Sequence, residues 1–508
     1  MMVESSSCFW KHLCLLLAVR CTFSVLSPVM DCDETFNYWE PLHFALFGTG
    51  LQTWEYSPEF ALRTYAYLGL HGSAALPLIA MTGNITGGLH SLGSVLPAST
   101  DKVFLFMFLR ASFASVSALG EALLCDAVGK RFGSQVATLS LVFMASNAGM
   151  FHAAGALLPS STCMIASTFA YWAWLEGRHL LGLGFGSLAV LLCWPFCALM
   201  FVPMGLNAVL ERGVLRVVLS AIVFALLFVG LPSVLDSMIY EQPTIAILNL
   251  VRYNVLGQGG GGAGANLYGV EPWHFYVQNL ALNHNIVFAL SLLSPFAVLL
   301  FWPRKKPSKQ FASKTLVFGF LSGSMLTLAL FTAMPHKEER FLSVTYPFLC
   351  VAAALSLHLL HKNIRRVLPV TIPTLRQFVD FGFEAAVIGI ILVGLSRIAA
   401  LHINFFAPMP IYEAFNKIAQ KGNPAFVPVL CVGKEWYRFP SSFFLPHQTN
   451  VKWIQTSFDG QLPQPFSSWR EGGASVTHLH FNDRNVGDKS AFTPLDACDF
   501  AVDLDLGS

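Results

Sequence analysis

Five ionisable residues stand in a row between two apolar segments, in the run His336–Arg340 (HKEER). The flanking segments, Leu316–Ala333 and Phe341–Leu360, each contain about the ~20 residues that a helix needs to cross a bilayer. Charge held at a membrane boundary costs free energy unless it is paired or hydrated, so such a cluster indicates a working site. A plain loop whose cations reach lipid head groups is the simpler alternative. Five adjacent groups of both signs favour the site.

A second polar motif is the segment Asp31–Pro41 (DCDETFNYWEP). Its first four residues include three carboxylates, which repel one another, and this repulsion suits one of them to take up a proton near neutral pH. A solvated acidic turn or a cation site is the alternative. Asp31-Cys32-Asp33 also matches the DxD motif of metal-dependent nucleotide-sugar enzymes, but nothing else in the chain fits that class. We therefore expect no metal and no cofactor.

Aromatic and polar residues follow in segments that the sequence predicts on the same side of a membrane. Carboxylates beside aromatic rings are typical of sugar sites, whereas an interfacial aromatic belt is the alternative reading. A glycine run at 259–264 lacks the surroundings of a nucleotide-binding loop. The candidate orienting or sugar-binding residues here are Trp39, Trp54, Tyr56, Arg63, Glu271 and Trp273.

Composition indicates a polytopic α-helical membrane protein followed by a small folded domain at residues 403–508, which we expect to be of the α/β class. Hydrophobic residues make up 54% of the chain and charged residues 12%, against roughly 25% charged in soluble domains. The net charge of +2 gives no support for nucleic-acid binding. We expect residues 1–402 to form the membrane body, with the fifth and sixth spans broken at Trp194-Pro195. The predicted spans, eleven in number, are approximately 11–29, 103–125, 134–150, 158–175, 181–193, 196–210, 215–236, 286–302, 314–334, 341–361 and 383–402.

The orientation of these spans follows from lysine and arginine in the short loops, which concentrate on the cytosolic side. A cytosolic N-terminus places every basic cluster in the cytosol. The alternative is a cleaved signal peptide at the N-terminus, which would leave ten spans and move the C-terminal domain to the cytosol. Loops 30–102, 237–285 and 335–340 and the domain 403–508 then face the other side. On that side, Asn84 begins a glycosylation sequon and Cys431 and Cys498 have the option of a disulfide.

Together these features suit transfer of a sugar from a phosphate-bearing lipid. His336, Lys337 and Arg340 would hold the departing phosphate through charge-assisted hydrogen bonds. Glu338 and Glu339 would orient these cations or contact sugar hydroxyls. Asp33 or Glu34 would take the proton from the attacking hydroxyl.

The motifs DCDETFNYWEP, QTWEYSP, YGxEPWxFY, HKEERFL and CVGKEWYRFPSS closely resemble those of the α-1,2-mannosyltransferases of N-glycan assembly, within the GT-C superfamily. The resemblance covers residues from about 30 to 505. It implies an endoplasmic-reticulum membrane enzyme with a luminal site and dolichyl-phosphate mannose as donor. It also implies dolichyl-pyrophosphate-linked oligosaccharide as acceptor, two inverting transfers at separate stages, and Asp33-Glu34 as the family's acidic pair.

Three other functions remain open from the sequence. The HKEERF element is shared with α-1,6-mannosyltransferases and with mannosyltransferases of glycosylphosphatidylinositol synthesis. A secondary transporter also keeps ionisable residues in a membrane, but within paired repeats that are not evident here. A non-catalytic scaffold would leave both polar motifs without a role.

Overall fold

The computed structural model describes residues 2–77, 96, 100–257, 262, 264–303, 308–368, 373–421 and 426–503. Asn84, most of the glycine run and Arg304–Lys306 lie outside the described residues. The chain divides into two compact units. The first contains Met1–Leu26, Ala111–Phe228 and Gly269–His402, and the second contains Ser27–Arg110, Val229–Tyr268 and Ile403–Ser508.

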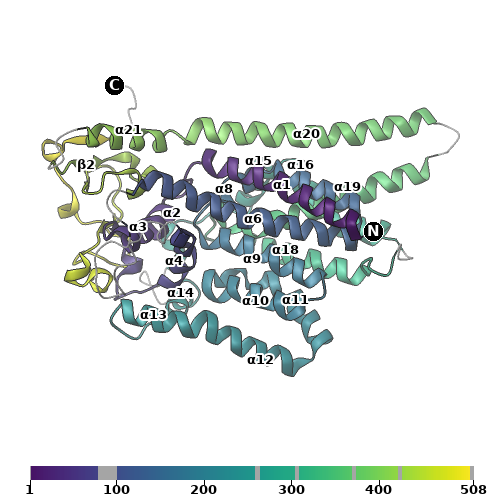
Figure 1. The fold of residues 1–508 in the computed structure, drawn as a ribbon, viewed down its shortest axis with the longest axis horizontal. Coiled ribbons are helices and arrows are strands. Elements are labelled where there is room, and N and C mark those ends of the chain that lie inside the picture. The colour runs from purple at the N-terminus through teal and green to yellow at the C-terminus, as the bar shows by residue number, and fades with distance from the viewer. Residues whose placement is uncertain are drawn as a thin grey trace. The chain divides into compact units, whose positions relative to one another are not determined.

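The described part of the first unit is built from helices (Figure 1). Two further helices, α6 (Lys102–Phe132) and α20 (Pro373–Phe405), belong mainly to it. Its other helices are α1 (Met2–Leu26), α7 (Ser134–Ala145), α8 (Ala148–Ala153), α9 (Pro159–Leu175), α10 (His179–Ser187), α11 (Ala198–Arg212), α12 (Val214–Ala225), α15 (Phe275–His284), α16 (Ile286–Leu292), α17 (Ser294–Phe301), α18 (Lys314–Ala333) and α19 (Tyr346–Val367).

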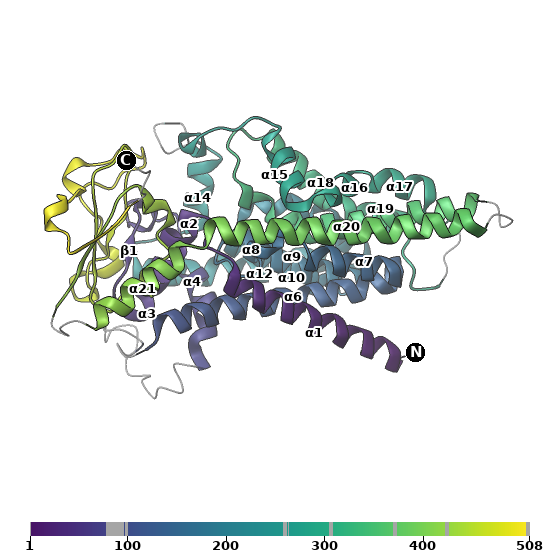
Figure 2. The same cartoon turned by 90° about the horizontal axis from the view of Figure 1, so that it is seen from above.

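Helix α19 forms the core of the first unit. Every residue from Tyr346 to Ser356 is buried, and the small side chains of Ala352–Ala354 let neighbouring helices approach closely. Helices α7, α16 and α17 pack against it, and Figure 2 shows α16, α17 and α19 side by side. Helix α12, by contrast, buries none of its residues within the chain, although it is almost wholly apolar. Such a helix is suited to contact lipid.

Six helices in the described part of the chain are long and apolar enough to cross a membrane. The predicted break at Trp194-Pro195 is present, because a π-helical turn ends at Cys193 and a 3-10 turn begins at Pro195. Several predicted spans therefore form shorter or interrupted helices, and the number of crossings stays a prediction. The six long segments are Phe9–Leu26, Lys102–Phe132, Val214–Ile239, Lys314–Ala333, Glu339–Val367 and Pro373–Ala419.

In the second unit the acidic motif is one continuous helical segment. Asp31 caps its start by accepting a hydrogen bond from Asp33 N, and α2 (Cys32–Glu34) continues through a π-helical turn into α3 (Glu40–Phe47). The helix ends at Gly48, whose φ of 75° lies in the left-handed region that glycine tolerates. The unit's other helices are α4 (Tyr65–Gly72), α13 (Leu231–Ile239), α14 (Ala246–Asn254) and α21 (Pro408–Gln420).

Residues 403–508, predicted as a C-terminal domain, share this unit with the first-loop residues 27–110. Strands β3 (Asn450–Trp453), β2 (Val429–Val432) and β5 (Phe500–Val502) form a parallel sheet in that order. A disulfide joins Cys431 to Cys498, with 5.8 Å between their Cα atoms. A second, antiparallel pairing joins β1 (Leu51–Gln52) to β4 (Gln464–Pro465).

Candidate active site

The HKEER cluster follows the end of α18, and its last two residues begin a 3-10 turn over Glu339–Thr345. Glu338 is its centre: one carboxylate oxygen lies 2.9 Å from His336 Nε2 and the other pairs with Arg340. His336 Nδ1 lies 2.8 Å from the carbonyl oxygen of Gly269. Burial alone would lower the pKa of His336, but the contacts with Glu338 and Gly269 outweigh it and raise that pKa. Contact with Glu338 therefore favours the protonated form of His336.

Lys337 has a more enclosed position than the sequence suggests, with only 6% of its surface exposed. Its ammonium group donates to the carbonyl oxygens of Met334 and Glu271, the latter at 2.7 Å. Glu271 N also donates to the carbonyl of Pro335, at 3.0 Å. Lys337 thus connects the Glu271 segment to the cluster, using two of the three N–H groups of its ammonium. The nearby Trp273 ring is 66% exposed.

In the acidic motif, Asp33 and Glu34 have different surroundings. Glu34 is 3% exposed and accepts a hydrogen bond of 2.9 Å from Trp39 Nε1. Asp33 is only partly buried. Ligand atoms of Asp31, Cys32 and Asp33 lie within 4.8 Å of one another, so the structure also offers these three side chains to a cation. Of the adjacent pair, Asp33 is the more exposed carboxylate.

Arg63 joins the acidic motif to the residues that follow β1. Its guanidinium donates to Glu55, at 2.5 Å, and to Tyr38 Oη, at 2.6 Å, while Asn37 Nδ2 reaches Glu55 at 3.3 Å. Burial alone would lower the pKa of Arg63, but Glu55 and Tyr38 outweigh it and raise that pKa; Asp33 acts in the same direction. Arg63 therefore stays charged and fixes two motifs that are separate in the sequence.

The predicted aromatic residues fall into two groups. Trp39 packs against Phe106 with ring centroids 4.3 Å apart, and Trp54 belongs to a buried cluster with Tyr253. Tyr56 is buried too, and its hydroxyl donates to the backbone oxygen of Asn37 at 2.8 Å. These three rings support the loop from inside. Trp273 is the one of the predicted rings whose surface is mostly open among the described residues.

Glu40 has no assigned role in the sequence analysis, yet it is the most heavily bonded carboxylate of the motif. It is fully buried and accepts hydrogen bonds from Ser441 Oγ (2.8 Å), Ser442 N (2.6 Å), Ser442 Oγ (2.8 Å) and Leu51 N (2.9 Å). Burial raises the pKa of Glu40, and the serine donors oppose that rise. The pairing of a WEP motif with a distant FPSS motif is the signal that could have revealed this contact.

The model of the Alg9-like mannosyltransferase family matches residues 11–446. The α-1,2-mannosyltransferase ALG9 of Mus musculus is 36% identical over 97% of this chain and 78% of its own length. The corresponding protein of Schizosaccharomyces pombe is 35% identical over 97% of this chain and 84% of its own length. The chain belongs to the Alg9-like mannosyltransferase family.

The fold agrees with membership of this membrane-enzyme family. The crystal structure of ArnT from Cupriavidus metallidurans bound to undecaprenyl phosphate has a TM-score of 0.56 and 13% identity, covering 88% of this chain and 86% of that chain. With the six long apolar helices, this likeness identifies a polytopic helical membrane protein. The mannosyltransferase is thus a glycosyltransferase with the architecture of a polytopic membrane protein.

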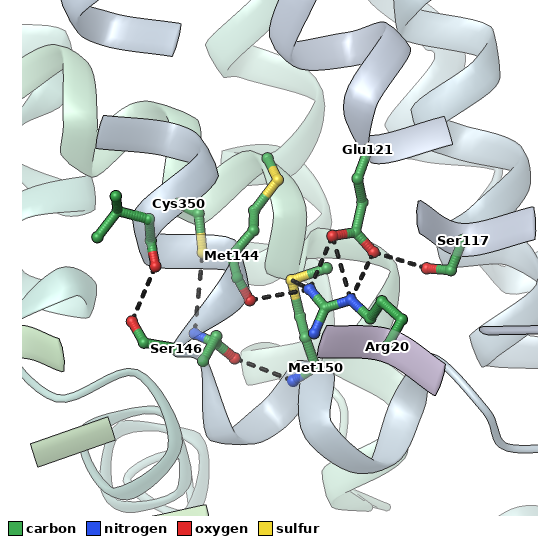
Figure 3. Close-up of polar contacts among 9 residues, drawn as sticks. Arg20, Ser117, Glu121, Met144, Ser146, Met150 and Cys350 are labelled. Atoms are coloured by element: carbon green, nitrogen blue, oxygen red, sulfur yellow. Dashed lines mark hydrogen bonds and ion pairs between the residues drawn. The ribbon is translucent and has the colours of Figure 1, made fainter. Parts of the chain in front are cut away.

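The mannosyltransferase also contains an ion pair that the sequence analysis did not single out. Arg20 of α1 and Glu121 of α6 are both fully buried and lie 2.7 Å apart, within two apolar helices (Figure 3). Arg20 also donates to the carbonyl of Met144 at 2.8 Å, and Ser117 Oγ donates to Glu121 at 2.8 Å. Each charge stands alone within an apolar segment of the sequence, and only the fold brings the two together.

We expect Glu40→Gln to destabilise the mannosyltransferase by roughly 3 kcal/mol, because an amide turns a donor group toward backbone and serine donors and leaves some of them unpaired. Thermal unfolding of the purified protein in detergent measures this. The matched control is Glu413→Gln, whose carboxylate lies on the surface in an i,i+4 pair with Lys417 and should matter by less than about 0.5 kcal/mol. Equal melting temperatures for the two variants would remove Glu40 from its anchoring role.

Proposed function

We propose that this protein transfers mannose from dolichyl-phosphate mannose to the dolichyl-pyrophosphate-linked N-glycan precursor, forming α-1,2 linkages at two stages. The observation that carries the proposal is the similarity to α-1,2-mannosyltransferases along 97% of the chain. The motifs of the acidic segment and of residues 431–442 support the α-1,2 reaction over the α-1,6 and glycosylphosphatidylinositol reactions. The enzyme would act in the endoplasmic-reticulum membrane.

The proposed reaction is a single displacement with inversion. The oxygen of the acceptor hydroxyl forms a bond to the anomeric carbon of mannose, on the face opposite the phosphate. The bond between that carbon and the phosphate oxygen breaks, and its electron pair leaves with dolichyl phosphate. The hydroxyl proton passes to Asp33, whose partly open carboxylate favours it over the enclosed Glu34.

The leaving phosphate is assigned to the cations of the HKEER cluster. His336 and Arg340 share the carboxylate of Glu338, which holds both side chains in place. Lys337 keeps one N–H beyond its two backbone contacts. Charge-assisted hydrogen bonds from these groups would stabilise the negative charge that develops on the departing oxygen.

We expect Arg340→Gln to lower kcat/KM for the mannose donor about tenfold or more, because a charge-assisted contact contributes roughly 1.5–3 kcal/mol. Steady-state transfer at varied donor concentration measures the change. Arg438→Gln is a matched control, since Arg438 is more exposed and its pair with Glu435 is long, at 3.4 Å. If Arg340→Gln responds to donor like the parent protein, the phosphate binds elsewhere.

We propose a luminal site, with eleven crossings and residues 403–508 in the lumen. The disulfide between Cys431 and Cys498 supports this, because disulfides persist in the lumen and are rare in the cytosol. Lys452→Thr converts exposed Asn450 into a glycosylation sequon, and we expect it to be occupied in cells. Arg365→Thr does the same at Asn363 in a predicted cytosolic loop and should stay unmodified. The reverse pattern would invert the topology.

The function is tested with purified protein, synthetic dolichyl-phosphate mannose and a defined lipid-linked acceptor. We expect a product that an α-1,2-specific mannosidase cleaves. A product resistant to that enzyme but cleaved by an α-1,6-specific one would assign the sister reaction. Sugar uptake by proteoliposomes without any glycosyl product would indicate a transporter.

A further inference from the structure

The two adjacent carboxylates of the HKEER cluster have opposite surroundings. Glu338 is occupied by His336 and Arg340, as described above. Among the described residues, Glu339 pairs with no lysine or arginine, and its side chain is 37% exposed. Its Oε1 accepts a hydrogen bond of 2.6 Å from Asn283 Nδ2 and lies 3.6 Å from His152 Nε2. No hydrogen bond within the described part of the chain reaches its Oε2.

The support for Glu339 comes from three separate helical elements. Asn283 lies on the last turn of α15, His152 on the last turn of α8, and Tyr346 at the start of α19. The Tyr346 hydroxyl donates to the backbone oxygen of Glu339 at 3.3 Å. Oε1 of Glu339 is therefore held in place by Asn283 and His152. Because Oε1 is held, the position of Oε2 is also defined.

Buried polar atoms of Asn283 and of the residue that follows it lack protein partners among the described residues. Asn283 is 2% exposed and its Oδ1 accepts no hydrogen bond within the described residues. The next residue, His284, is fully buried, and neither ring nitrogen has a partner there. Each such atom costs roughly 1–3 kcal/mol when it is left unpaired. Buried polar groups are usually satisfied by protein or by ordered water, so the space around Asn283 is polar in character.

We propose that Glu339, positioned by Asn283 and His152, accepts hydrogen bonds from hydroxyl groups of the sugar on the donor lipid. A carboxylate oxygen with a neutral amide behind it is a strong acceptor for sugar hydroxyls. The donor sugar is favoured over the acceptor sugar because Glu339 is next in the chain to Glu338 and Arg340, which the proposed function assigns to the phosphate on that same sugar. The inference rests on the proposed function, and it assigns recognition of the donor sugar to Glu339.

The test separates the sugar from the phosphate by using two ligands. Binding of dolichyl-phosphate mannose and inhibition by dolichyl phosphate, which has no sugar, are measured on the full-length protein. We expect Glu339→Gln to weaken binding of the mannose lipid about tenfold or more and to leave inhibition by dolichyl phosphate unchanged. Asn283→Ala should produce a smaller loss in the same direction. Glu413→Gln should change neither quantity.

Two results would overturn the inference. One is an equal loss for both ligands, which would mean that Glu339 acts on the cations or on the fold. The other is unchanged binding of both. Glu339→Asp, which keeps the charge but shortens the reach, serves if Glu339→Gln does not fold, and should show the same selective loss. Failure of the parent protein to transfer mannose is a separate result and would count against the proposed function itself.

Discussion

Replacement of Asp33 by asparagine is expected to lower kcat by about 10²–10⁴-fold, the usual contribution of a general base. A sugar hydroxyl is a weak acid, so its proton must leave as the new bond to the anomeric carbon forms. Asparagine keeps the shape and the helical position of Asp33 in α2 but cannot accept that proton. Because the phosphate contacts are untouched, donor binding should stay near that of the parent protein. Single-turnover transfer and donor binding, measured together, give both quantities.

The adjacent Glu34 provides the comparison for this prediction. Its carboxylate accepts the Trp39 indole hydrogen bond and is almost fully buried. We therefore expect Glu34→Gln to affect the melting temperature more than the chemical step. If Glu34→Gln abolishes turnover and Asp33→Asn does not, the two roles must be exchanged. If neither variant is slow, the base lies outside this motif and the mechanism proposed here is wrong.

The sequence predicts the helical membrane architecture well because hydrophobicity determines which segments can leave water. The break at Trp194-Pro195 is visible in the sequence for the same reason that it exists: proline lacks the N–H that a continuous helix needs. The lengths of the remaining helices are harder to predict. Ser134–Ala145, for example, is an apolar helix too short to count as a span, and it packs against α19.

The candidate site is predicted only in part, and the missing part consists of long-range contacts. The HKEER cluster and the acidic pair are conspicuous in the sequence, because charged residues beside apolar segments cost free energy unless they are paired or hydrated. Glu40 and Ser442 are 402 positions apart, and no local pattern links them. Lys337 shows a further limit: its charge is evident from the sequence, but its two backbone partners are not. The sequence also does not distinguish the two tryptophans: the structure buries Trp54 but leaves Trp273 mostly exposed.

The buried pair of Arg20 and Glu121 should contribute the largest stability effect of any single contact in the helical unit. Removing one partner leaves the other as an unpaired charge among apolar helices, which costs roughly 3–5 kcal/mol. We therefore expect Arg20→Met to lower the melting temperature and the yield of folded protein sharply. The double variant Arg20→Met with Glu121→Leu should recover most of the loss, because two apolar side chains need no partner and fill a similar volume.

Lys130, on the same helix α6 as Glu121, provides a control for the loss of a positive charge. Lys130 pairs with Glu176 at 2.9 Å, but both side chains are partly exposed, and exposed pairs contribute about 0–1 kcal/mol. Lys130→Met should consequently leave the melting temperature nearly unchanged. Thermal unfolding of all four proteins in one detergent makes the comparison. A double variant less stable than Arg20→Met alone would mean that Glu121 stabilises the bundle through Ser117 and its own helix, independently of the arginine.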